Sequence, residues 1–330
     1  MARLGFAHGA TRPTRPELAQ LIYALDAYGI GTKMDVTRLI FTELFFEGHM
    51  QSLSKTNNRV LCGAARLLIA VLMLILEFPY ALARAEEQSG LVRWVAAPHR
   101  SAGNVARDGF RHPLETLTFF GIKENSTVVE ILPGSGGYYM EILAPFLKAR
   151  GGYIAANRDE AAAPQYLADH QKLLARLKAE PAFYEKVLVT KFNADKHEIA
   201  SPGSADFVLT FRNLHNWVER SEIDGALRAF HRALKPGGAL GVVDHRGRTD
   251  ISQEAQMKSG YVRQDFAIAV IEKAGFKLAG ASEINANPKD TKDHPEGVWT
   301  LPPTYRLKDK DRAKYQAIGE SDRFTLRFVK

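Results

Sequence analysis

The run Val128-Val-Glu-Ile-Leu-Pro-Gly-Ser-Gly-Gly-Tyr138 contains the features that decide the fold. An apolar segment typical of a buried strand, Thr127–Leu132, leads into a glycine-rich turn, and Tyr139–Lys148 follows with the spacing of a helix. Glycines let the backbone approach a ligand closely, and such a turn lies at the carboxyl edge of an α/β sheet, where nucleotides bind. Taken alone, the turn is also compatible with a nicotinamide dinucleotide site or with a tight connection that binds nothing.

Strands and helices alternate on both sides of this turn. The predicted strands are Thr127–Leu132, Gly152–Ala156, Val187–Phe192, Ala205–Thr210, Ala239–Asp244, Phe276–Ile284 and Arg323–Val329. The predicted helices are His112–Phe120, Tyr139–Lys148, Pro164–Ala179, Glu222–Leu234 and Arg263–Ala274. This alternation predicts an α/β fold with a doubly wound, mostly parallel, seven-stranded sheet.

The composition is that of an ordinary globular protein. Of the 330 residues, 45% are hydrophobic and 25% are charged, so a buried core is expected. The 44 Lys and Arg residues outnumber the 37 Asp and Glu residues, but the basic residues are scattered, so no nucleic-acid partner is predicted. The single cysteine, Cys62, precedes the predicted α/β domain, which therefore has no disulfide, no Cys-based zinc site and no cysteine nucleophile.

The segment 50–85 has the order of parts found in a secretory signal peptide. Basic residues are followed by the short apolar run Leu67–Leu76 and by the small-x-small site Ala83-Arg84-Ala85. The apolar run is too short to span a bilayer comfortably, and a buried core helix is the alternative. Because Met50 provides a natural start, we interpret residues 1–49 as a mis-assigned upstream extension.

These features predict three parts: the extension 1–49, a signal peptide or hydrophobic anchor at 50–85, and the α/β domain at 86–330. The protein is expected to be exported, either periplasmic or secreted, with any membrane contact made through residues 67–76. A cytoplasmic location is the alternative.

Polar residues follow the predicted strands at the sheet edge that carries the glycine turn. Glu130 lies on the strand before the glycines, where a carboxylate can attract a cationic ligand. Asn157, Asp195 and Asn213 follow the second, third and fourth strands. Loops at this edge of an α/β sheet commonly carry ligand-binding residues, so these side chains are expected to form a site.

Together these motifs resemble the class I S-adenosylmethionine-dependent methyltransferase family over about residues 97–330. The glycine turn looks like the family's first motif, Ala194-Asp195 like its adenine-side motif, and Asp206-Phe-Val-Leu-Thr-Phe-Arg-Asn-Leu-His215 like its fourth. Tyr138–Phe146, Asp244-His-Arg246 and the ending from Asn287 to Phe324 are similar to a bacterial group of uncharacterised predicted methyltransferases, many of which are exported.

The resemblance implies a Rossmann-like sheet with a final antiparallel strand, an S-adenosylmethionine cofactor and a small-molecule methyl acceptor. It places at the cofactor the residues Glu130, Gly134, Ser135, Gly136, Gly137, Asn157, Ala194, Asp195 and Asn213. Two positions depart from the family pattern. Leu132 stands where a glycine is usual, and Asn157 stands where an acidic residue usually holds the ribose, although an amide can also bond a diol.

Methyl transfer from a sulfonium is a direct displacement, and a base is needed only if the acceptor must lose a proton. His215 and His245, which end the fourth and fifth strands, are the candidates. The flanking residues Asp244 and Arg246 favour His245, and His215 is alternatively expected to pack beside Trp217. No spacing of His, Asp or Glu compels a metal site, so none is predicted.

Two other functions fit the same features. A nicotinamide-dependent oxidoreductase uses a similar turn, although the G-x-G-x-x-G pattern is absent. A non-catalytic binding protein of the same fold is favoured by the predicted export, because S-adenosylmethionine is made in the cytoplasm. Fold alone does not separate these functions from methyl transfer.

Overall fold

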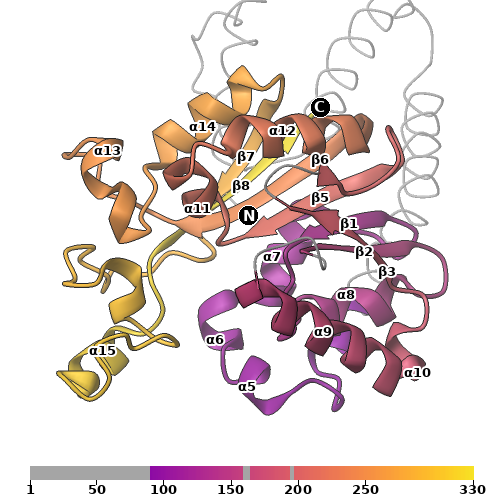
Figure 1. The fold of residues 1–330 in the computed structure, drawn as a ribbon, viewed down its shortest axis with the longest axis horizontal. Helices are drawn as coiled ribbons and strands as arrows, with labels where there is room; N and C mark the ends of the chain where they lie inside the picture. Colours follow the sequence, from indigo (N-terminus) through magenta and orange to yellow (C-terminus); the bar gives the residue numbers. More distant parts are fainter. Residues whose placement is uncertain (1–89, 159–163, 194–196) are drawn as a thin grey trace, which may run out of the picture. The chain divides into compact units, whose positions relative to one another are not determined.

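The computed structural model describes residues 90–158, 164–193 and 197–330 (Figure 1). The predicted export segment 50–85, the extension 1–49 and the residues Ala194 and Asp195 lie outside this part of the chain. Each helix of the described part falls short of the length and apolar character that crossing a bilayer requires.

In the described residues, eight strands form one sheet in the order β4-β3-β2-β1-β5-β6-β8-β7. The strands are β1 (Thr127–Ile131), β2 (Gly152–Asn157), β3 (Leu188–Phe192), β4 (His197–Glu198), β5 (Ala205–Phe211), β6 (Leu234–His245), β7 (Lys277–Ser282) and β8 (Arg323–Val329). The pairs from β3 through β2, β1 and β5 to β6 are parallel, whereas β8 is antiparallel to both β6 and β7. The predicted mostly parallel sheet with a final antiparallel strand is confirmed. The two-residue strand β4, antiparallel to β3, is an addition that is too short to leave a periodic pattern in the sequence.

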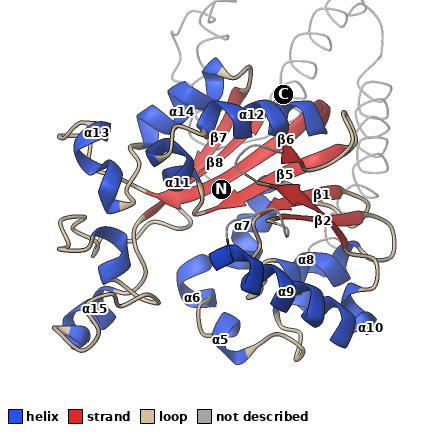
Figure 2. Ribbon diagram, in the orientation of Figure 1, coloured by secondary structure: helices blue, strands red, loops and turns tan. Residues whose placement is uncertain are grey.

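Helices cover both faces of the sheet (Figure 2). They are α5 (Ala102–Val105), α6 (Asp108–Arg111), α7 (Pro113–Phe120), α8 (Met140–Leu147), α9 (Pro164–Ala179), α10 (Pro181–Tyr184), α11 (Leu214–Glu219), α12 (Ile223–Ala233), α13 (Gln253–Gln256), α14 (Gln264–Lys273) and α15 (Arg312–Ile318), with the short 3-10 turns η2 (Met257–Ser259) and η3 (Gly297–Thr300). Helices α11, α12 and α14 pack on one face, and α7, α8 and α10 pack on the other.

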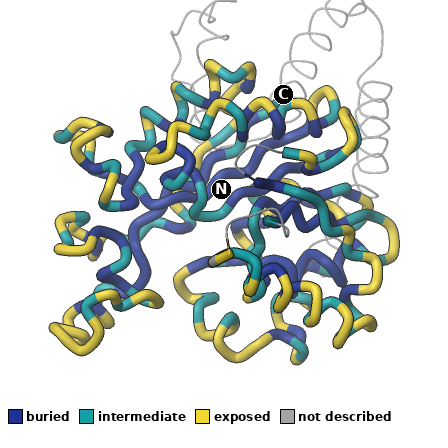
Figure 3. The backbone as a smooth tube through the Cα atoms, viewed as in Figure 1, coloured by how far each residue is buried: buried dark blue, intermediate teal, exposed yellow. Residues whose placement is uncertain are grey.

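The two hydrophobic layers are divided by the pleat of the strands. On β1, Val129 points into the layer that contains Trp217 and Phe230, and its neighbour Val128 points into the layer that contains Ile142. This alternation follows from the two-residue period of a strand. The central strands are therefore buried on both faces (Figure 3), and their carboxyl ends provide the edge at which polar groups gather.

Candidate active site

The chain passes from β1 into α8 through the turn that begins at Leu132. Leu132, Gly134 and Gly137 have positive φ angles of 53°, 64° and 48°. Left-handed backbone is easy for glycine but costs other residues about 1–2 kcal/mol, so Leu132 is held in a conformation that favours glycine. Its backbone N–H donates to the carbonyl of Ala156 on β2 over 2.8 Å, and this bond helps to hold the leucine in place.

A carboxylate from α9 fixes the same turn. Asp169 accepts hydrogen bonds from the Ser135 hydroxyl over 2.6 Å and from the Ser135 backbone N–H over 3.1 Å. Gly134 lies so near that a Cβ atom on it would stand 3.6 Å from Asp169 Oδ2. The turn is therefore held rigidly and has a negative charge beside it.

A first cavity of about 290 Å³ opens over this turn. It is lined by residues that follow β1, β2 and β5 and by residues of α9 and α11: Leu132, Gly134, Asn157, Arg158, Tyr166, Asp169, Asn213, Asn216, Trp217 and Arg220. The side-chain Nδ2 of Asn157, a residue 4% exposed, has no hydrogen-bond partner within the described residues. A buried amide donor without a partner is unfavourable, so an oxygen of a ligand in this cavity would satisfy it.

The structure brings Gly134, Asn157 and Asn213, three of the residues expected at a cofactor, to the first cavity. The Asn213 amide donates to the carbonyl of Ile131 over 3.1 Å. This bond ties the end of β5 to the end of β1, so the two strand ends hold one wall of the cavity together.

The other turn residues are not among the described residues that line the first cavity. Gly136 is exposed, and its carbonyl accepts hydrogen bonds from Asn104 over 2.9 Å and Arg176 over 3.0 Å. Ser135 is bonded to the α9 carboxylate, and Gly137 is buried where a side chain would collide with α8. In the structure these residues shape the turn, and their place at the cofactor stays a prediction.

The carboxyl group of Glu130 also lies away from the first cavity. Glu130 is 4% exposed and accepts a hydrogen bond from the hydroxyl of Tyr153 over 2.6 Å. Burial raises the pKa of Glu130 to about 7, against the opposing effects of this bond and of Arg111. Glu130 is therefore not placed to attract a cationic ligand, and Asp169 is the carboxylate that lines the cavity.

Glu130→Gln is expected to raise the free energy of unfolding near pH 8 by about 3 kcal/mol. An unfolded glutamate ionises near pH 4.5, whereas Glu130 keeps its proton to about pH 7 in the folded protein. The carboxyl group therefore lowers stability progressively as the pH rises from 4.5 to 7, and the full loss is present above that range. Glutamine accepts the Tyr153 hydrogen bond without ionising. Urea unfolding near pH 5 and pH 8 measures the difference, and a variant no more stable than the parent near pH 8 would contradict it.

A second cavity of about 250 Å³ adjoins the first and shares Leu132, Asn213 and Asn216 with it. Its other lining residues come from the carboxyl ends of β5 and β6, from α11, from η3 and the loop after it, and from the loop before β8. They are Phe211, Arg212, His215, His245, Val298, Trp299, Pro302, Pro303, Thr304, Glu320 and Ser321. The two cavities therefore lie side by side at the sheet edge and share part of their lining.

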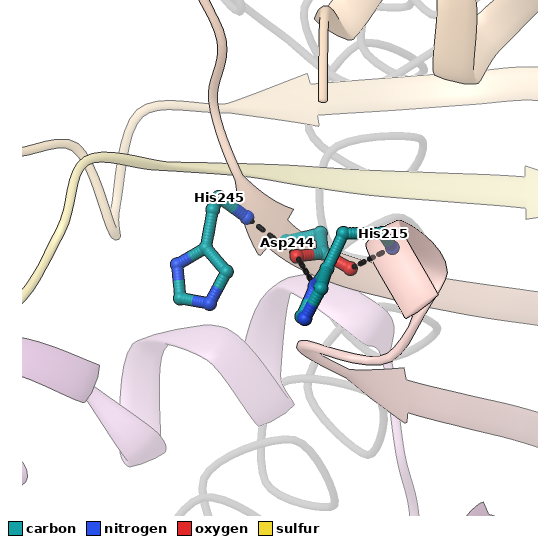
Figure 4. A group of neighbouring side chains, drawn as sticks. All are labelled: His215, Asp244 and His245. Atoms are coloured by element: carbon teal, nitrogen blue, oxygen red, sulfur yellow. Dashed lines mark hydrogen bonds and ion pairs between the residues drawn. The ribbon is translucent and has the colours of Figure 1, made fainter. Parts of the chain in front are cut away.

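His215, in the wall of the second cavity, is paired with Asp244 (Figure 4). His215 Nδ1 lies 3.0 Å from Asp244 Oδ1, and the backbone N–H of His215 donates to Asp244 Oδ2 over 3.2 Å. Burial alone would raise the pKa of Asp244, but the charge and hydrogen bond of His215 outweigh it and lower that pKa. An ionised Asp244 selects the tautomer of His215 with its proton on Nδ1, which leaves Nε2 as the basic nitrogen. Asn216 Nδ2 lies 3.0 Å from this Nε2.

His245 is held differently. Its backbone N–H donates to Asp244 Oδ1 over 2.7 Å, but its ring bonds Ser321, with His245 Nδ1 2.5 Å from Ser321 Oγ. Burial lowers the pKa of His245 well below its ordinary value despite the charge of Asp244, and the nearby Arg212 and Arg323 lower it further. A weakly basic imidazole is a poorer proton acceptor than one that is paired with a carboxylate.

The reasons that favoured the histidine of β6 in the sequence are not met in the structure. Asp244 bonds the ring of the other histidine, and Arg246 pairs with Glu283 over 2.7 Å. Trp217, expected beside His215, packs in the core against rings from β3 and α12. The geometry therefore favours His215 as the candidate base.

His215, Asp244 and His245 have the residue types of a metal site, and their ligand atoms lie within 4.8 Å of one another. The surrounding charge opposes a cation, because Arg212 and Arg323 lie near enough to lower the pKa of His245. The expectation that no metal ion binds stays a prediction, and the local electrostatics favour it.

Sequence reasoning missed Asp169, Asn216, Arg212 and Glu320. Arg212 lies inside the motif that ends at His215, so its position at the end of a strand could have marked it. Asp169 lies in the middle of a helix and Glu320 in a loop, and no local pattern distinguishes either of them.

No protein-family profile matches the chain, and no curated protein matches its sequence. The chain has low-identity similarity to solved structures. A SAM-dependent methyltransferase from Aquifex aeolicus is 17% identical, with a TM-score of 0.46 over 68% of this chain and 92% of that one. The cyclase SpnF is 15% identical, with a TM-score of 0.47 over 76% and 94% of the two chains. A SAM-dependent methyltransferase from Methanosarcina mazei is 13% identical, with a TM-score of 0.43 over 65% and 96%.

Proposed function

We propose that the chain transfers a methyl group from S-adenosylmethionine to a small-molecule acceptor. The observation that supports this most is the pair of adjoining cavities at the carboxyl edge of the sheet. One lies over the glycine turn and the other beside a histidine–aspartate pair, and both are bordered by Leu132, Asn213 and Asn216. A direct displacement needs its two reactants held next to each other in a fixed orientation, which two cavities with a common wall provide.

The residues of the first cavity fit the donor. The Asn157 amide, which lacks a partner in the described part of the chain, can donate to a ribose hydroxyl, and Gly134 allows the backbone to come close. The Asp169 carboxylate provides negative charge for the ammonium and sulfonium groups. When bound, S-adenosylmethionine would supply a methyl group on a sulfonium sulfur. The sulfur is the leaving group, and it departs as a neutral thioether that needs no proton.

In the second cavity, His215 is the proposed general base for an acceptor whose attacking atom carries a proton. Its Nε2 accepts that proton, and the charge of Asp244 stabilises the imidazolium that forms. Asn216 occupies Nε2 with its amide and also lines both cavities, so an acceptor bound there would take the place of this amide.

Asn157→Ala is expected to weaken the binding of S-adenosylhomocysteine, the product of the donor, about tenfold, because one buried hydrogen bond to the ribose is lost. Asn125→Ala is the matched control, since Asn125 is exposed and precedes β1 at the opposite edge of the sheet. Calorimetric titration of the full chain measures both affinities. Equal affinities for the two variants would contradict the placement of the donor.

A non-catalytic binding protein of the same fold would also bind S-adenosylhomocysteine in this titration. It would differ in a turnover assay, where it would methylate no acceptor. Export of the protein stays a prediction, because residues 50–85 lie outside the described part of the chain.

A further inference from the structure

Arg212 and Glu320 both line the second cavity, and Glu320 is bound by three further arginines of the described residues. Arg107 Nε lies 2.6 Å from Glu320 Oε1, while Arg323 Nη1 and Arg111 Nε lie 3.0 Å and 3.4 Å from Glu320 Oε2. The charges of all four groups also act on Arg212 and shift its pKa. We call Arg107, Arg111, Arg212 and Arg323 the arginine cluster.

The guanidinium groups of the arginine cluster outnumber the carboxylate that they surround, Glu320. Burial would raise the pKa of Glu320, but Arg111, Arg323 and Arg107 bring it down to about 2, so Glu320 is ionised. Glu130, which also senses Arg111, has a pKa of about 7 and is only partly ionised at neutral pH. Glu320 therefore balances only part of the positive charge of these four guanidinium groups.

Donor groups of the arginine cluster also lack acceptors within the described part of the chain. Nη2 of Arg107, Nη2 of Arg111 and Nε of Arg323 are buried there without a hydrogen-bond partner, and Arg111 and Arg323 are each 3% exposed. The side chain of Arg212 forms no hydrogen bond or ion pair with those residues. Buried charged donors without acceptors are unfavourable. Of the four arginines, Arg212 lines the second cavity, so an oxyanion bound there would accept hydrogen bonds from its guanidinium and reduce the repulsion within the cluster.

The conformation of Arg212 supports a role in binding. Its φ angle of 61° lies in the left-handed region that favours glycine, and its backbone N–H donates to the carbonyl of Val243 over 2.7 Å. Burial lowers the pKa of Arg212 to about 9, and the charge of Arg111 contributes. The guanidinium still carries its charge at neutral pH. A strained backbone and an unfavourably placed charge at one cavity are typical of a functional residue.

We infer that the methyl acceptor carries an oxyanion, a carboxylate or a phosphate, which binds to Arg212 in the second cavity. The identity of this ligand as the acceptor rests on the proposed methyl transfer, whereas the anion site rests on the arginine cluster itself. Because His215 lines the same cavity, an acceptor held by its anion would be held beside the proposed base.

The donor also contains a carboxylate, but Arg212 lines the second cavity and is not among the described residues that line the first. We therefore assign the anion site to the acceptor. This assignment predicts that an anion and the donor product bind together.

The test titrates the full chain with inorganic phosphate and, separately, with acetate, and records the binding heat and the midpoint of thermal unfolding. We expect the parent to bind these anions, and the tighter of the two identifies the group. Arg212→Gln should weaken the binding of that anion at least about tenfold. The control Arg248→Gln removes an equal charge from the exposed Arg248–Asp250 pair and should change the affinity less than about twofold. Equal anion affinity for the parent and Arg212→Gln would overturn the inference.

Without added anion, Arg212→Gln should leave the unfolding midpoint unchanged or raise it, because the substitution removes repulsion within the arginine cluster. A lower midpoint would mean that Arg212 supports the fold, and would overturn its assignment as a binding residue.

A titration in the presence of saturating S-adenosylhomocysteine distinguishes an anion of the acceptor from the carboxylate of the donor. We expect the affinity for phosphate or acetate to be the same with and without S-adenosylhomocysteine. Loss of anion binding would assign the arginine cluster to the donor's own carboxylate and overturn the inference. The anion titration needs no turnover, so a failure to bind S-adenosylhomocysteine would count against the proposed function and would leave the anion site standing.

Discussion

Asp244→Asn is expected to lower the turnover number by at least about a hundredfold. An asparagine keeps the shape of Asp244, and its single oxygen can still accept the hydrogen bond from the backbone N–H of His215, while the bond from the backbone N–H of His245 to the other oxygen is lost. It carries no charge to stabilise a protonated His215, and its NH2 group can turn towards Nδ1 and select the wrong tautomer. Initial rates with labelled donor measure the loss, with an acceptor first found by screening anionic metabolites from extracts.

The histidine variants are the controls for this prediction. His215→Ala should lose turnover to a similar extent, and His245→Ala should lose less than about tenfold. Donor affinity should change little in each variant, because the proposed donor site lies over the glycine turn. A larger loss for His245→Ala than for His215→Ala would contradict the assignment of the base.

Glu320→Gln is expected to lower the free energy of unfolding by about 3 kcal/mol at neutral pH. Glu320 is the carboxylate within the arginine cluster, and its pKa is lowered from 4.5 to about 2 by the guanidinium groups around it. A glutamine leaves those buried charges without a counter-charge, which is the costly way to break a buried ion pair. Urea unfolding of the parent and the variant measures the difference.

The pH dependence provides a second readout of Glu320. Because its pKa in the folded protein is lower than in the unfolded chain, its contribution to stability is complete above about pH 4.5 and is lost as the pH falls towards 2. The variant should lack this component. The control Glu296→Gln breaks an exposed pair with Arg306, at 3.6 Å, and should change stability by less than about 1 kcal/mol. A Glu320→Gln protein as stable as the parent at neutral pH would contradict the account of the cluster.

The order of the strands and helices could be predicted from the sequence because each element leaves a local pattern. The apolar run that contains Val128 and Val129 predicts a central strand, and the glycines that follow it predict the turn over which the first cavity opens. The end of the chain predicts the antiparallel strand, which the structure has as β8. Asn157 and Asn213 were predicted at the site because they come after the second and fourth predicted strands.

The chemistry of the site depends on pairs that are far apart in the chain, and no sequence pattern records them. Asp169 reaches Ser135 from a helix that begins beyond β2, and Asp244 at the end of β6 reaches His215 in α11. The bond from Arg107 to Glu320 joins residues 213 positions apart. For Glu130 the sequence predicted a contact that the structure does not have. Its position before the glycines suggested a ligand, but the pleat of β1 turns its side chain towards Tyr153 in a buried layer.

The most direct measurement is a calorimetric titration of the full chain with S-adenosylhomocysteine and, separately, with NAD. The adjoining cavities and the Asn157 amide predict saturable binding of S-adenosylhomocysteine at one site per chain, and at least about tenfold weaker binding of NAD. Absence of binding by S-adenosylhomocysteine, or tighter binding of NAD, would contradict the proposal that this protein is a methyltransferase.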